Sequence, residues 1–317
     1  MKRFLKLLGL FGLFSTVLTS IIVAGFFYKH DVDINSLPAL NFSDSYSFNE
    51  KIRFMKENKT DAEILALGSS MTLNNLDSEV ISKHFNSESY LNAGSWGMSP
   101  IDNYKFLQSL SEERSFKKII ICTNFCDFTE QKKKFDFDYM QNYLNSNYFG
   151  LTIDFVSNFD LEYYTTNVPY SKRVRSAVNE YTDLQFEPYG SVPYEGTNFK
   201  IDSTRWNNTH FNKDEGRSHY VYLDSIAWYC SQNDIELTVL QSPYRSGLES
   251  KLDTSETRRL DEHIYRVKRI IKNRNQTFVN MTKYSWEDSL FVDGIHFNSM
   301  GSKLFTEKAF NEIKASP

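Results

Sequence analysis

Short apolar runs alternate with segments of helical spacing along most of the chain. Five runs have the length and apolar content of buried strands, at residues 63–67, 89–92, 118–122, 235–240 and 277–280. Between them lie segments such as 255–274, whose apolar residues fall on one helical stripe. Strands that alternate with helices predict an α/β fold, with a doubly wound parallel sheet of about five strands.

The N-terminus carries a different pattern, an uncharged apolar segment over residues 7–28. Its length of about 22 residues suffices to cross a bilayer as a helix. The apolar region of a cleaved signal peptide is usually about 7–15 residues long, so an uncleaved signal anchor at 1–28 is favoured. Three basic residues precede the segment. The positive-inside bias then places the N-terminus in the cytoplasm and the rest of the single-pass chain outside.

The rest of the chain divides into a polar leader and a folded domain. Residues 29–60 are predicted to form a stalk and a leading helix, and 61–317 the α/β domain. The stretch 135–212 is rich in Tyr, Asn, Phe and Asp and has no sustained period, which predicts an insertion or lid. Two roles suit its tyrosines, stacking on sugars or packing in a core or interface: Tyr139, Tyr143, Tyr148, Tyr163 and Tyr164.

Charge and cysteine content exclude some functions. The formal net charge of -4 and the absence of a basic stripe argue against a nucleic-acid partner. Three cysteines cannot form a fully paired disulfide framework, and none are in C-x-x-C spacing. The sequence therefore indicates no zinc or other metal site, and no cofactor site is visible.

Three motifs carry candidate chemistry. Residues 68–72 (GSSMT) follow the first predicted strand, where a serine on a tight turn can project its hydroxyl beyond the sheet edge. Residues 92–97 (NAGSWG) follow the second strand, and their glycines let the backbone approach a ligand. Near the C-terminus, Asp293 and His296 stand in Asp-x-x-His spacing, so that the carboxylate can orient the imidazole as a general base. Each motif alone is weak, because similar sequences occur in ordinary loops.

In this order the motifs resemble the SGNH/GDSL hydrolase superfamily. Its first block, Gly-Asp-Ser-x-(Thr/Ser), is matched by 68–72, its oxyanion-hole glycine by Gly97, and its last block by Asp293 and His296. The resemblance covers about 61–130 and 233–314 and implies an SGNH-like three-layer sandwich. It also implies a catalytic triad of Ser70, Asp293 and His296, with an oxyanion hole made by the backbone amides of Ser70 and Gly97.

Two departures from the family pattern bear on function. Ser69 replaces the first-block Asp, a Gly-Ser-Ser variant similar to a membrane-anchored branch that acylates cell-envelope polymers. In the third block, normally Gly-x-Asn-Asp, residues 123–127 read TNFCD. If Asp127 aligns with the family Asp, Cys126 stands where the Asn of the oxyanion hole should be. Asn124 could then act as a third donor only if the loop is remodelled.

The resemblance implies a serine acyltransferase with an extracytoplasmic catalytic domain, in a bacterial periplasm or at the cell exterior. It would move an acyl group, expected to be acetyl, onto a cell-envelope or extracellular polysaccharide through an acyl-Ser70 intermediate. A multipass membrane acyltransferase is the expected donor partner. Two alternatives stay open. One is a carbohydrate esterase that removes acetyl groups with the same triad. The other is a non-catalytic glycan-binding or assembly module, which the altered third block supports and the intact triad opposes.

Overall fold

The computed structural model describes residues 1–29, 40–58, 62–129, 133–147, 149–150, 184–195 and 203–315, with four single positions between 151 and 166. The chain divides into two compact units. One consists of Met1–Asn41 and Ser146–Ala177, and the other of Phe42–Asn145 and Val178–Pro317.

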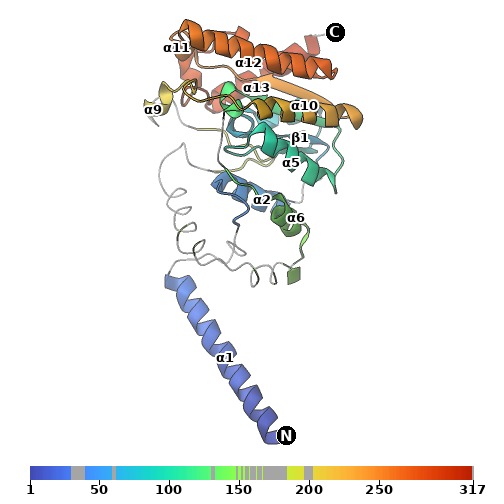
Figure 1. The fold of residues 1–317 in the computed structure, drawn as a ribbon, viewed down its shortest axis with the longest axis vertical. Coiled ribbons are helices and arrows are strands. Elements are labelled where there is room, and N and C mark those ends of the chain that lie inside the picture. Colours follow the sequence, from blue (N-terminus) through green and yellow to red (C-terminus); the bar gives the residue numbers. More distant parts are fainter. Residues whose placement is uncertain are drawn as a thin grey trace. The chain divides into compact units, whose positions relative to one another are not determined.

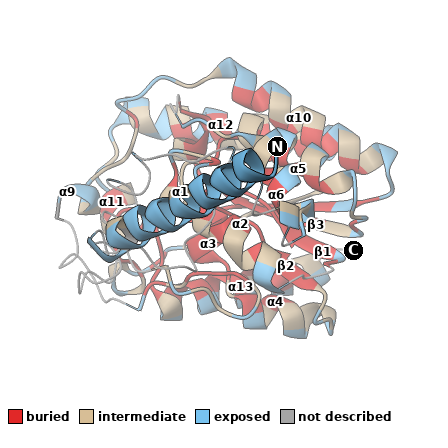
Figure 2. Cartoon of the chain, turned by 90° about the horizontal axis from the view of Figure 1, so that it is seen from below, coloured by how far each residue is buried: buried red, intermediate tan, exposed pale blue. Residues whose placement is uncertain are grey.

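The first unit contains one long helix, α1 (Lys2–Lys29), drawn in blue in Figure 1. Nearly all of its side chains are exposed, as the pale blue ribbon in Figure 2 shows. Leaving so many large apolar side chains in water is unfavourable, and a bilayer would remove that cost. The part of α1 from Lys2 to Phe26 is long and apolar enough to cross a membrane. By length and composition it fits the predicted N-terminal transmembrane helix.

The second unit is built on a five-stranded sheet in which every neighbouring pair of strands is parallel. The strand order is β2-β1-β3-β4-β5. The central strands are almost wholly buried, because their side chains are apolar on both faces. The predicted α/β class and all five predicted strands are confirmed: β1 (Ile64–Ala66), β2 (Tyr90–Asn92), β3 (Lys118–Thr123), β4 (Glu236–Gln241) and β5 (Thr277–Asn280).

Helices cover both faces of this sheet, as expected for a doubly wound fold (Figure 2). One set packs through α10, which contacts both α5 and α12. The other packs through α13, which contacts both α3 and α4. These helices are α3 (Ser70–Asn75), α4 (Ser78–Phe85), α5 (Pro100–Ser111), α10 (Arg217–Gln232), α12 (Thr254–Asn273) and α13 (Ser299–Ala315). Shorter elements complete the unit: η2 (Phe125–Phe128), α6 (Phe137–Asn145), α9 (Ser203–Trp206), α11 (Ser246–Glu249), η4 (Met281–Lys283) and η5 (Asp288–Leu290).

The leading helix α2 (Tyr46–Asn58) is part of this unit and not of a stalk. Its side chains Phe48 and Ile52 are fully buried, and the ring of Phe48 packs edge-on against Phe106 of α5. The unit begins at Phe42, which is itself buried. The predicted domain boundary at residue 61 therefore lies inside the folded unit, because apolar residues on α2 complete its core.

The predicted insertion at 135–212 is described only in part. Residues 151–152, 167–183 and 196–202, with the positions of Tyr148, Tyr163 and Tyr164, lie outside the described residues. In the described part, α6 packs against α5 and α2. The rings of Tyr139 and Tyr143 lie 4.8 and 5.2 Å from the ring of Phe42. These two tyrosines pack against the core of the unit, as one of the two predicted roles requires.

Candidate active site

Ser70 is the first residue of α3, directly after the turn that follows β1. Gly68 has a φ of +156°, and a Cβ there would lie 2.1 Å from Thr72 Oγ1. A side chain at residue 68 therefore has no room, which explains the glycine. Ser69 caps α3, because its hydroxyl accepts a hydrogen bond of 3.0 Å from the N–H of Met71. With the first serine of the pair used as a cap, the hydroxyl of Ser70 is left for chemistry.

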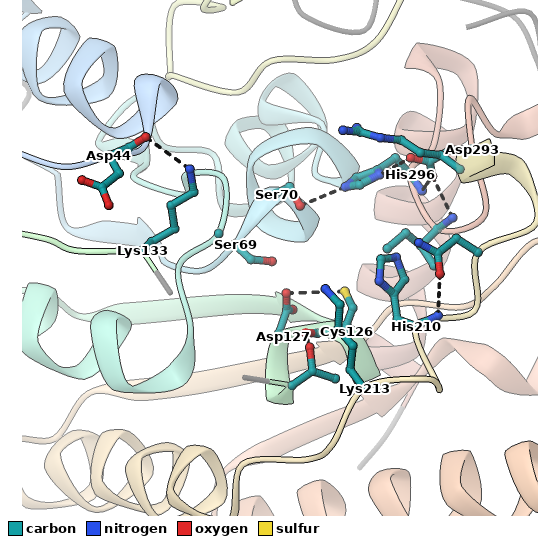
Figure 3. A pocket seen from close by; sticks show the side chains of 15 residues that line it. Asp44, Ser69, Ser70, Cys126, Asp127, Lys133, His210, Lys213, Asp293 and His296 are labelled. Atoms are coloured by element: carbon teal, nitrogen blue, oxygen red, sulfur yellow. Dashed lines mark hydrogen bonds and ion pairs between the residues drawn. The ribbon is translucent and has the colours of Figure 1, made fainter. Parts of the chain in front are cut away.

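His296 lies beside Ser70 although 226 positions separate them in the chain. Its Nε2 is 2.9 Å from Ser70 Oγ, and its Nδ1 is 2.7 Å from Asp293 Oδ2 (Figure 3). Both contacts are within hydrogen-bonding distance. Such lengths are expected between a nucleophile and its general base, and between that base and the group that orients it. The structure thus brings together all three residues predicted for the triad.

The loop that presents Asp293 and His296 is closed at its base. Phe291 and Phe297 form an antiparallel bridge across it, and their rings pack in a tilted arrangement with centroids 4.2 Å apart. Inside the loop, Asp293 Oδ1 accepts hydrogen bonds from the N–H groups of Ile295 (2.9 Å) and His296 (2.8 Å). One carboxylate oxygen fixes the loop and the other holds the imidazole, so the Asp-x-x-His spacing is set by local geometry.

Asp293 is held in its charged form. Burial by itself would raise the pKa of this carboxyl, but the adjacent His296 and the two loop N–H groups outweigh burial and lower the pKa to about 2. Asp293 is therefore ionised at neutral pH. An ionised carboxylate on Nδ1 selects the tautomer in which Nδ1 carries the proton, which leaves Nε2 free to accept the proton of Ser70.

The second motif forms a tight turn beside Ser70. The N–H of Ser95 donates to the carbonyl of Gly68 (3.0 Å), which joins this turn to the nucleophile turn. Gly97 has a φ of +76°, in the left-handed region that favours glycine. Gly97 lines the same pocket as Ser70 and His296. Its position fits the predicted role of its amide in an oxyanion hole.

The third motif resolves the two readings of Asn124. This side chain is fully buried and lies outside the pocket lining. Its amide donates to the carbonyl of Ser242 (3.0 Å), and its oxygen accepts from the N–H of Cys126 (3.4 Å) as the cap of η2. The amide nitrogen and the amide oxygen of Asn124 thus both make hydrogen bonds in local structure.

Cys126 and Asp127 line the pocket instead (Figure 3). The Cys126 thiol lies 3.7 Å from Asp127 Oδ1, and burial raises the pKa of this thiol well above its ordinary value. Asp127 Oδ2 accepts from the hydroxyl of Thr123 (2.8 Å) and from the N–H of Asn124 (3.1 Å). Cys126 is therefore a neutral thiol and a weak hydrogen-bond donor.

The pocket above Ser70 has a volume of about 640 Å³, and its lining includes both charged and apolar side chains. Among the lining residues that the sequence did not single out are Lys133, Arg205, His210 and Lys213. The last three come from the 203–213 segment, which lacks regular periodicity and gave no signal before folding. Burial, with the nearby charges of Lys213 and His296, lowers the pKa of His210 to about 4, so this ring is neutral at pH 7.

Among the described residues, no group of three or more His, Cys, Asp or Glu side chains is placed to hold a metal ion. The fold and the site together define an α/β protein with a serine–histidine–aspartate arrangement.

No family model and no curated protein matches the chain. Among solved structures it is similar to a lipase/acylhydrolase from Enterococcus faecalis (14% identity, 80% of this chain and 96% of that chain, TM-score 0.39). It is also similar to a GDSL-like lipase from Bacteroides thetaiotaomicron (12% identity, 84% of this chain and 99% of that chain, TM-score 0.42). A third similar structure is a catalytic mutant of an acetylxylan esterase from Geobacillus stearothermophilus (11% identity, 80% of this chain and 94% of that chain, TM-score 0.40). The roles assigned below rest on the geometry of this chain.

Replacing Asn124 by alanine distinguishes a cap from a third oxyanion donor. Because Asn124 caps η2, Asn124→Ala should lower the free energy of unfolding by about 0.5–2 kcal/mol. Turnover of a small acetyl ester by the folded variant should fall less than about threefold, whereas loss of an oxyanion donor typically costs about 10²–10³. Denaturant unfolding and kcat, measured on the same preparation, give both values. A loss near 10² in kcat with the fold intact would mean that Asn124 acts as a third oxyanion donor.

Proposed function

We propose that this protein is a serine acyltransferase that works through an acyl-Ser70 intermediate. The observation that carries the proposal is the continuous hydrogen-bond chain from Ser70 Oγ through His296 to the ionised Asp293, at the floor of an open pocket. A structural serine–histidine pair would not need a buried carboxylate that fixes the imidazole tautomer. This arrangement opposes the alternative of a non-catalytic glycan-binding module.

The first half-reaction forms the acyl-enzyme. His296 Nε2 takes the proton of Ser70 as Oγ bonds to the carbonyl carbon of the donor ester, giving a tetrahedral oxyanion. The backbone amides of Ser70 and Gly97 are proposed to stabilise this oxyanion. The ester C–O bond then breaks, and the leaving alkoxide takes the proton from His296.

The second half-reaction runs the same steps with an acceptor hydroxyl. His296 removes the proton of the acceptor hydroxyl, and the oxygen of that hydroxyl attacks the acyl carbon. The bond between the acyl carbon and Ser70 Oγ then breaks, and His296 returns the proton to Oγ. The exposed cationic side chains of Lys133, Arg205 and Lys213 in the pocket lining suit a hydroxyl-rich acceptor better than a long apolar chain. A cell-envelope or extracellular polysaccharide is the acceptor class we propose, with acetyl as the group transferred.

The candidate anchor α1 supports an extracytoplasmic site for this reaction. Basic residues at the N-terminal end of α1 favour a cytoplasmic N-terminus, with the α/β unit on the other side of the membrane. A catalytic domain there has no direct access to cytoplasmic acyl donors. A multipass membrane acyltransferase that carries the acyl group across is therefore the proposed donor partner.

Esterase activity is the second candidate, because water can take the place of the acceptor hydroxyl in a pocket that is open to solvent. The same triad serves both reactions, so only the fate of the acyl group separates them. Incubation with a small acetyl ester and an oligosaccharide acceptor tests this. A transferase acetylates the sugar in preference to water, whereas an esterase releases acetate at a rate that the sugar does not change.

Substitutions in the triad test whether Ser70 is the nucleophile. Ser70→Ala and His296→Ala should each lower acyl transfer by at least about 10³-fold, because nucleophile and base act as one unit. Ser69→Ala is the matched control. It removes the neighbouring hydroxyl and weakens the cap of α3 but leaves the hydrogen bond between Ser70 and His296, so most of the activity should remain. Transfer by Ser70→Ala at the wild-type rate would refute the enzyme proposal and favour the binding module.

A reporter fusion tests the orientation in the membrane. A reporter that folds only outside the cytoplasm, fused after Pro317, should be active when expressed with the full chain. The control replaces Lys2, Arg3 and Lys6 by glutamine, which removes the charges that set the orientation and should lower reporter activity. Activity of a cytoplasm-only reporter at the same position would contradict the proposed topology.

A further inference from the structure

Two buried serines at the start of α2 hold the peptide that precedes Gly97. The hydroxyl of Ser45 donates to the carbonyl oxygen of Trp96 (2.8 Å), and the hydroxyl oxygen of Ser47 accepts from the N–H of Trp96 (2.8 Å). Both serines are at most 1% exposed. We infer that Ser45 and Ser47 are positioning residues that orient the Gly97 amide toward the oxyanion formed on Ser70. This inference rests on the proposed function.

The geometry of the peptide unit gives the reason. The carbonyl of Trp96 and the N–H of Gly97 belong to one planar trans peptide, and they point in opposite directions. A hydrogen bond that fixes the carbonyl of Trp96 therefore fixes the direction of the Gly97 N–H as well. Gly97 has a φ of +76° and lacks a Cβ. Without a Cβ, its backbone restricts rotation of the Trp96–Gly97 peptide plane less than that of another residue would. The restraint has to come from outside the turn, and Ser45 supplies it.

Further contacts make the support rigid. The Ser47 hydroxyl lies 2.8 Å from that of Ser95, in the same turn as Gly97. One turn further along α2, the side chain of Lys51 is fully buried, and its Nζ donates to the carbonyl of Asn92 (2.8 Å), where the motif begins. The second carbonyl that Lys51 contacts belongs to Gly190. Both ends of the 92–97 motif are thus bound to α2, whose apolar face is anchored in the core.

The support comes from the chain that follows α1. Ser45 lies 16 residues after Lys29, the end of α1, within the region that the sequence assigned to a stalk and leading helix. A separate α/β domain starting at residue 61 would lack every one of these contacts. The leader is therefore required for the chemistry as well as for attachment.

The test uses Ser45→Ala in the full-length chain. Loss of the restraint should lower kcat for a small acetyl ester by about 10-fold, less than the 10²–10³ that removal of a donor costs. KM should stay within about twofold, because the amide acts on the transition state and not on the bound ester. Affinity for an alkyl boronic acid, which adds to Ser70 as a tetrahedral anion, should fall by the same factor as kcat. Ser47→Ala, the second variant, should change the same quantities in the same direction.

Ser302→Ala is the matched control. Ser302 is also 1% exposed, and its hydroxyl also donates to a main-chain carbonyl, that of Ser299 (3.0 Å), but it lies in α13 away from the turn. It should lower thermal stability about as much as Ser45→Ala and leave kcat and boronate affinity unchanged. If Ser45→Ala behaves like Ser302→Ala in both readouts, the positioning role is refuted while the proposed function stands. A wild-type chain that neither turns over the ester nor binds the boronate would refute the proposed function, and this inference with it.

Discussion

The hydrogen bond between Ser70 and His296 is the interaction on which the site depends. It joins the turn after the first strand of the sheet to a loop that precedes the last helix. A parallel sheet makes this possible, because the carboxyl ends of its strands meet at one edge and carry their loops there together. The closed loop between Phe291 and Phe297 then sets the height and angle of the imidazole, and Asp293 fixes its tautomer. Distant segments thus produce a short, directed proton path.

The oxyanion side of the site depends on a different principle. Its proposed donors are backbone amides, and an amide can be aimed only by fixing its peptide plane. The peptide plane of the Ser70 amide is fixed by its place at the start of α3. That of the Gly97 amide is fixed by Ser45 and Ser47, which bond to the preceding residue, Trp96. Asn124, which would have been a side-chain donor, is used as a cap. Positioning by hydrogen bonds among buried hydroxyls explains why so many small polar residues lie inside this unit.

Strand runs and strand-end motifs could be predicted from the sequence because both are local. The apolar run at 118–122 predicts a buried strand from its own residues. The Asp-x-x-His spacing is also local, because the loop that places the two side chains is closed by hydrogen bonds within it. The direction of Asn124 could not be predicted, since it depends on the carbonyl of Ser242 in a loop after another strand. The same holds for the packing of α2: its apolar spacing predicts a helix, but the contacts that this helix makes in the core depend on other elements. His210 and the cations of the pocket come from irregular segments, where sequence gives no periodic signal.

The central claim is that Ser70 becomes acylated, and trapping that species tests it most directly. The full chain is mixed with a small acetyl ester, quenched in acid within the first turnovers, digested and mapped by mass spectrometry. The account predicts one acetyl group on the peptide that contains Ser70, placed on that residue and not on Ser69. It also predicts that the adduct is absent from His296→Ala and disappears from the wild-type chain when an acceptor is added. Acetylation of lysines alone, or equal labelling of Ser70→Ala, would contradict it.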